Sequence, residues 1–169
     1  SRPFQYVGSL GPVVLSGVHT TQLVRIGSTL ADRFRLQGLF GVDAIVNDKG
    51  IWTVEVNPRY TASVEILERA MNIAAMRLHV EACTNGRLSA AKSRCSSNSG
   101  DVIHGKAVVY AARSIVINDS MSQALQAMNG ECEHPVVADI PMPDTCIAVG
   151  EPIATVFAAG TTITDVKQR

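Results

Sequence analysis

Apolar residues recur at helical spacing in two segments of the chain, and a hairpin-like pattern lies between these segments. In the first segment, four of them lie three or four positions apart: Leu23, Ile26, Leu30 and Phe34. This spacing predicts a helix with one apolar stripe. Thr20 or Thr21 is the expected N-cap, and the helix should end near Gly38.

A second helical pattern covers residues 61–83. Its apolar positions are Val64, Leu67, Ala70 or Met71, Ala74, Leu78 and Cys83. They predict one continuous helix, with Thr61 or Ser63 as its cap and Glu65 in its first turn. The positive end of its dipole and its free N–H groups would favour an anion near the residues that precede it.

Residues 39–57 have the pattern of a β-hairpin. Strands are predicted at 39–46 and 51–56, joined by the turn residues 47–50, which include Asn, Asp and Gly. Pro58 has no N–H for the ladder and should end the second strand. The helix that follows would therefore start just beyond the hairpin.

Three polar residues of this hairpin should gather on one surface. Asp43 and Glu55 lie on opposite strands, and Asn57 follows Glu55 by two positions, which places both on one face. Two carboxylates and an amide oxygen suit Mg²⁺ or Mn²⁺. Arg59 follows with a guanidinium suited to a phosphate or carboxylate. Ordinary solvated acids beside a turn are the alternative interpretation.

The segment 38–65 resembles the metal-binding core of the ATP-grasp superfamily, which has an acidic residue on one strand and Glu-x-Asn on the next. Asp43 and the run from Glu55 to Arg59 match that pattern. The resemblance implies that Asp43, Glu55 and Asn57 hold Mg²⁺ on the phosphates of ATP, with Glu55 and Asn57 also lining the nucleotide site. It implies that Arg59 stabilises an acyl phosphate or its acceptor.

One position departs from the biotin carboxylase members of this superfamily. Those proteins have a glutamate four residues after the arginine, as a base for bicarbonate, whereas Ser63 occupies that position here. The nearest glutamate is Glu65. A bicarbonate substrate is therefore not expected.

The remaining sequence predicts a change of structure after the second helix. Residues 89–101 are small, polar and rich in serine, as in a linker. Short strands with Gly and Pro turns follow, typical of a small barrel or sandwich. We expect an α+β fold: the C-terminal half of an ATP-grasp domain with an antiparallel sheet (1–88), a linker or mobile loop (89–101) and a small β-rich domain (102–169). The last resembles the domain that closes many carboxylase-like ATP-grasp enzymes.

Composition excludes some classes of function. Lys+Arg and Asp+Glu are both 15, so no basic excess points to nucleic acid. No apolar run has the length of a membrane span. The four cysteines form no CxxC pair and predict free thiols in a reducing cytoplasm, not a zinc site. The start at Ser1 is typical of a cut inside a longer chain.

The expected function is that of the C-terminal part of a cytoplasmic ATP-grasp ligase. The resemblance implies that Mg-ATP converts a small carboxylate to an acyl phosphate, which an amine or similar nucleophile then attacks. The other half of the clamp, on a missing N-terminal segment or a partner subunit, should be needed, so this piece alone should be inactive. The alternative is a non-catalytic regulatory or interaction module that dimerises through its β-rich domain.

Overall fold

The computed structural model describes residues 3, 5–87, 102–132 and 134–168. By their contacts the described residues form two compact units, one between residues 12 and 87, the other containing those up to 11 and from 102 onward. The predicted linker, 89–101, lies outside the described residues. The limits proposed for the three sequence segments stay a prediction.

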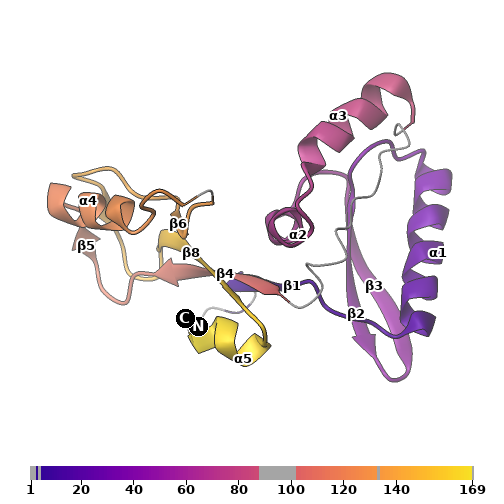
Figure 1. Cartoon of the computed structure of the whole chain (residues 1–169), viewed down its shortest axis with the longest axis horizontal. Helices are drawn as coiled ribbons and strands as arrows, with labels where there is room; N and C mark the ends of the chain where they lie inside the picture. Colours follow the sequence, from indigo (N-terminus) through magenta and orange to yellow (C-terminus); the bar gives the residue numbers. More distant parts are fainter. Residues whose placement is uncertain (1–2, 4, 88–101, 133, 169) are drawn as a thin grey trace. The chain divides into compact units, whose positions relative to one another are not determined.

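The unit of residues 12–87 is built on one hairpin and three helices. They are α1 (Gly17–Phe34), β2 (Gly41–Asn47), β3 (Gly50–Asn57), α2 (Val64–Met71) and α3 (Ala75–Asn85). The predicted hairpin is confirmed, since β2 and β3 pair antiparallel from Gly41 opposite Asn57 to Asn47 opposite Gly50. Helix α1 lies along this ribbon and contacts β3 (Figure 1).

Helix α1 begins earlier than predicted. Its N-cap is Ser16, whose hydroxyl accepts the N–H of His19 at 3.2 Å. The predicted caps lie inside the first turn, where Thr20 and Thr21 donate back to backbone carbonyls. The helix ends at Arg35 in the left-handed region, before Gly38, and Phe34 is 68% exposed. The prediction that Phe34 belongs to a core stripe is therefore wrong for this unit.

The single helix predicted over residues 61–83 is divided into α2 and α3. Asn72 ends α2 in the left-handed conformation (φ 50°), which asparagine adopts more readily than most residues. The Glu68 carboxylate then accepts the N–H of Ala75, the first residue of α3, at 2.6 Å. The apolar spacing continues across this break and therefore predicted one helix. It carries no information about the conformation of Asn72.

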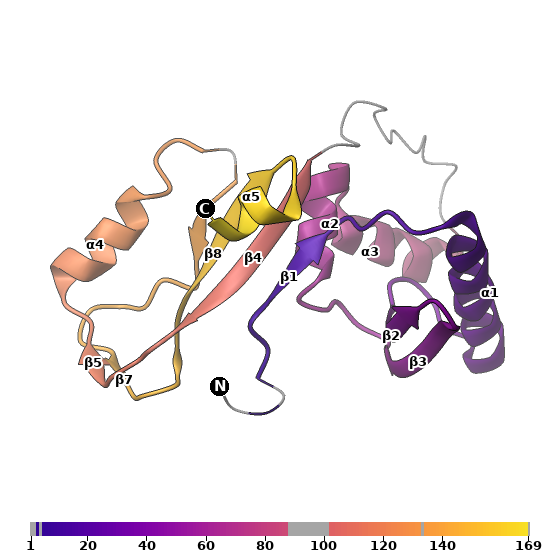
Figure 2. The same cartoon turned by 90° about the horizontal axis from the view of Figure 1, so that it is seen from below.

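The other unit contains a four-stranded antiparallel sheet in the order β1-β4-β8-β6. Its strands are β1 (Gly8–Gly11), β4 (Ile103–Tyr110), β6 (Val137–Ala138) and β8 (Pro152–Gly160). A second pair consists of β5 (Ile115–Val116) and β7 (Cys146–Ile147), and the helices are α4 (Asp119–Ala127) and α5 (Ile163–Gln168). Figure 2 shows β1, β4 and β8 side by side, with α5 against them.

The α and β content with antiparallel sheets is confirmed, but the barrel or sandwich is not seen. No sheet closes on itself within the described residues. A small apolar cluster forms where the β5–β7 pair meets the loops around it, with Ile117 fully buried among Ala111 and Ile147. Strand β1 belongs to this unit because it pairs with β4. The two strands are far apart in the sequence, and no local pattern predicted their pairing.

Candidate functional site

The hairpin places the two predicted acidic ligands opposite one another. Asp43 of β2 and Glu55 of β3 are direct cross-strand partners, and both are exposed. Directly opposite residues in an antiparallel pair have Cβ atoms roughly 5 Å apart and share one face. The register shifts by one residue just after Asp43, a bulge that re-aims the side chains on either side of it.

Asn57 lies at the same end of the ribbon and is almost fully buried, with 7% of its surface exposed. Its side-chain Nδ2 donates to Oδ2 of Asp43 at 3.4 Å. Asp43, Glu55 and Asn57 therefore lie together at the end of the hairpin away from the turn. In this arrangement Asn57 presents its amide nitrogen, not its oxygen, to Asp43.

Arg59 lies in the turn that leaves β3. Its backbone N–H donates to the carbonyl of Asn57 at 2.8 Å, and its Nη1 donates to the carbonyl of Tyr60 at 3.3 Å. The side chain is exposed, so most of its donors face solvent. Helix α2 begins soon after, at Val64, and Ser63 at its cap position makes no side-chain cap bond.

The chemistry of this cluster fits a hard divalent cation. Two exposed carboxylates in register, beside an amide, provide oxygen ligands for Mg²⁺ or Mn²⁺ and leave room for water and phosphate oxygens. Among the described residues, no group of three or more His, Cys, Asp or Glu side chains forms a denser metal cage. The metal-binding roles of Asp43, Glu55 and Asn57 stay a prediction.

Sequence reasoning missed a polar network directly beside this cluster. The hydroxyl of Tyr60, the residue after Arg59, donates to Oε2 of Glu68 at 2.6 Å, while Oε1 of the same carboxylate caps α3. Burial, and then the hydrogen bond to Glu68, raise the pKa of Tyr60 well above its ordinary value of 10.0. No spacing rule in the sequence pointed to the pairing of Tyr60 with Glu68.

A second missed contact fixes the entry to β2. Nδ1 of His79, on α3, accepts the N–H of Leu39 at 3.0 Å. The preceding Gly38 has φ 78°, and a Cβ there would clash with the His79 ring. A glycine is required at this position both for its backbone conformation and for space.

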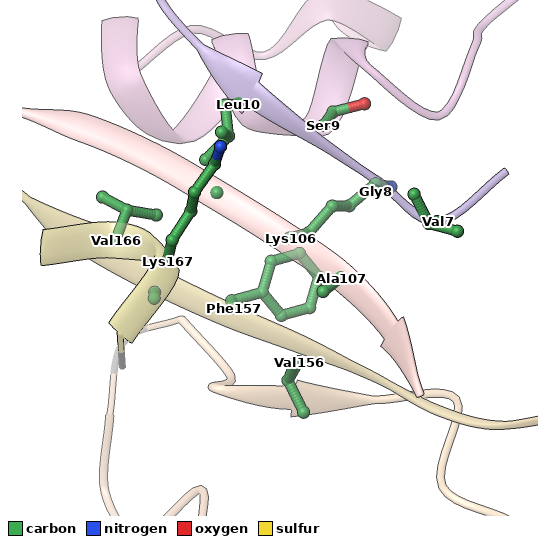
Figure 3. Close-up of a pocket in the computed structure, with 12 residues that line it drawn as sticks. Val7, Gly8, Ser9, Leu10, Lys106, Ala107, Val156, Phe157, Val166 and Lys167 are labelled. Carbon is green, nitrogen blue, oxygen red and sulfur yellow. The ribbon is translucent and has the colours of Figure 1, made fainter. Parts of the chain in front are cut away.

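Each unit has a cavity among its described residues. Figure 3 shows the cavity of about 440 Å³ formed by β1, β4, β8 and α5, with a mostly apolar lining that includes Leu10, Phe157 and Val166. The other, about 660 Å³, lies between α1 and the turn of the β2–β3 hairpin. Neither contains Asp43, Glu55 or Asn57.

The sequence pattern of the ATP-grasp domain family matches residues 1–63, which include Asp43, Glu55, Asn57 and Arg59. The resemblance to ATP-grasp proteins is confirmed. An uncharacterized protein of Methanocaldococcus jannaschii is 27% identical over 153 residues, which are 90% of this chain and 33% of that protein. The chain thus spans about a third of the length of this relative.

Several solved structures share the fold of this chain. The L-amino acid ligase of Bacillus licheniformis has a TM-score of 0.70 at 12% identity, over 98% of this chain and 43% of the ligase. Phosphoribosylglycinamide synthetase of Anaerococcus prevotii has a TM-score of 0.62 at 14% identity, over 96% and 42%. A single-chain, multi-domain long-chain acyl-CoA carboxylase gives 0.64 at 18%, over 96% and 18%. At these identities the likeness shows the fold alone.

The helices of the described residues include none that combines the length and the apolar character needed to cross a bilayer.

Proposed function

We propose that this chain is part of an ATP-dependent ligase of the ATP-grasp type, which activates a carboxylate as an acyl phosphate and joins it to an amine or similar nucleophile. The observation that carries the proposal is the pairing of Asp43 with Glu55, with Asn57 3.4 Å from Asp43, inside the segment that matches the ATP-grasp family. Oxygen ligands in that arrangement suit a cation shared with phosphate oxygens.

In this proposal Asp43 and Glu55 hold Mg²⁺ or Mn²⁺, and the ion offsets charge on the phosphates of ATP. Asn57 holds the Asp43 carboxylate through its Nδ2, and would itself ligate the ion only after its amide group rotates. Arg59, exposed beside the cluster, binds the acyl phosphate or the incoming acceptor. In phosphoryl transfer, the main contributions of the protein are positioning and charge stabilisation.

The partners follow from the length of the relatives. The chain covers 42–43% of the L-amino acid ligase and phosphoribosylglycinamide synthetase structures, and a third of the relative from Methanocaldococcus jannaschii. We propose that the rest of the clamp, on further polypeptide or on a partner subunit, completes the ATP site, and that the whole protein works in the cytoplasm on small-molecule substrates.

The decisive experiment compares Glu55→Gln with Asp48→Asn. Both remove one exposed acid from the hairpin, but Asp48 lies in the turn, away from the cluster. In the full-length protein, ATP- and Mg²⁺-dependent release of ADP should fall by about a hundredfold or more in Glu55→Gln, the scale for one lost electrostatic contact to a reacting group. It should be unchanged in Asp48→Asn. Equal rates in the two variants would remove the metal role.

A further inference from the structure

The cavity between α1 and the hairpin turn is built on one face of a helix. Gln22, Arg25, Ile26, Thr29 and Leu30 lie three or four positions apart on α1 and all line it. The turn end of the ribbon supplies the opposite wall. Its volume of about 660 Å³ falls in the range of roughly 300–1,000 Å³ typical of small-molecule sites.

This cavity is separate from the candidate metal cluster. It lies at the turn end of the hairpin, where Asn47 pairs with Gly50. Asp43 lies four positions before Asn47, and its partner Glu55 lies five positions after Gly50. The lining reaches Trp52, which pairs with Ile45, so at about 3.3 Å per residue its nearest part lies roughly 7 Å from Asp43 along the ribbon. None of the residues that line the cavity belongs to the candidate metal cluster.

Two cations line the cavity from opposite walls. Arg25 comes from α1 and Lys49 from the turn, and both are exposed. Neither side chain forms an ion pair with an acid in the described part of the chain. The backbone of Lys49 is fixed in the turn, because its N–H donates to the Asn47 side chain at 2.8 Å. An anionic ligand in the cavity would be attracted by both charges.

Trp52 supplies a flat apolar surface in the same cavity. Its indole lies beside Gly50, since a Cβ at Gly50 would be 3.9 Å from the Cη2 atom of Trp52, and the residue is 46% exposed. Ile26 and Leu30 add half-buried apolar side chains from α1. An exposed aromatic ring with cations nearby suits a ligand that is planar and negatively charged.

We infer that this cavity binds a small aromatic or heteroaromatic carboxylate. The ring of the ligand stacks on Trp52, its carboxylate lies between Arg25 and Lys49, and Gln22 and Thr29 offer further hydrogen bonds. The inference does not depend on the proposed ligase activity, because none of these residues belongs to the candidate metal cluster.

The test uses the chain's one tryptophan as its own reporter. Benzoate should quench Trp52 fluorescence saturably, and calorimetry should give the same dissociation constant. Benzamide, which keeps the ring and lacks the charge, and cyclohexanecarboxylate, which keeps the charge and lacks the flat ring, should each bind about tenfold more weakly or worse. Equal binding of all three compounds, or no binding of benzoate, would overturn the inference.

Variants locate the site. Arg25→Gln and Lys49→Gln should each weaken benzoate binding about tenfold, as expected for loss of a charge-assisted hydrogen bond. Arg33→Gln is the matched control, since it removes an exposed arginine of the same helix that does not line the cavity. Glu55→Gln should leave benzoate binding unchanged, which separates this site from the ligase proposal. Loss of binding equal in Arg33→Gln and Arg25→Gln would contradict the assignment.

Discussion

Replacing Glu68 with alanine removes two hydrogen bonds at once from the junction between α2 and α3. One carboxylate oxygen accepts the hydroxyl of Tyr60, and the other accepts the N–H of Ala75, each at 2.6 Å. Both are short, as expected when the acceptor is ionised. Glu68 is half-buried, so water replaces the lost partners only in part.

The magnitude follows from these two bonds. Loss of a side-chain cap costs about 1 kcal/mol, and a hydrogen bond to a charged group contributes about 1.5–3 kcal/mol. Since Glu68 is half-buried, the lower end applies to the Tyr60 bond. Glu68→Ala should therefore lower the free energy of unfolding of this unit by about 2–3 kcal/mol.

Urea unfolding followed by tryptophan fluorescence measures this quantity for the right unit. Trp52 is the one tryptophan of the chain and lies in the unit of residues 12–87. Glu65→Ala is the matched control: it removes a glutamate from the same helix, whose ion pair with Arg69 at 3.4 Å is partly exposed. Such a pair contributes less than about 1 kcal/mol. If Glu68→Ala unfolds at the same urea concentration as Glu65→Ala, the bridging role of Glu68 is refuted.

Two further predictions concern Tyr60 and Asn129. Because burial and Glu68 raise the pKa of Tyr60, the folded state keeps this proton longer than the unfolded state. The contribution of this shift to the free energy of unfolding is therefore complete below about pH 10 and is lost as the pH rises further. Urea titrations should show that Tyr60→Phe loses less stability at alkaline pH than the unchanged protein does. The side chain of Asn129 accepts the N–H groups of Val136 and Val137 and donates to the Val137 carbonyl. Asn129→Ala should therefore lower the free energy of unfolding of its unit by about 2 kcal/mol. Thermal unfolding followed by circular dichroism should show this loss as a lower melting temperature. An unchanged melting curve would contradict this count of bonds.

The hairpin was predictable because its signals are local. The residues between Asn47 and Gly50 specify a turn, and the turn sets which residues pair beside it, from Val46 opposite Ile51 to Ala44 opposite Thr53. The structure adds the bulge after Asp43, which brings Glu55 instead of Val54 opposite Asp43, and the orientation of the Asn57 amide. Both depend on packing around the strands, which no spacing rule contains.

The misplaced helix limits have a different cause. Three residues have side chains suited to capping: Ser16, Thr20 and Thr21. The choice among them depends on the conformation of the segment that precedes the helix. The break at Asn72 depends on a carboxylate seven positions before Ala75, beyond the reach of local cap patterns. The pairing of β1 with β4 joins segments far apart in the sequence, and therefore no periodicity reports it.

Glu68 also connects the candidate site to the helices beside it. Tyr60 directly follows Arg59, and the bond to Glu68 anchors Tyr60 to the start of α3. Arg59 in turn is joined to the end of β3 by the bond from its N–H to Asn57. The turn that carries Arg59 is thus fixed at both ends, to the hairpin and to the α2–α3 junction. The proposed role of Arg59 in binding an acyl phosphate would benefit from such fixed positioning, because geometry provides most of what phosphoryl transfer requires of a protein.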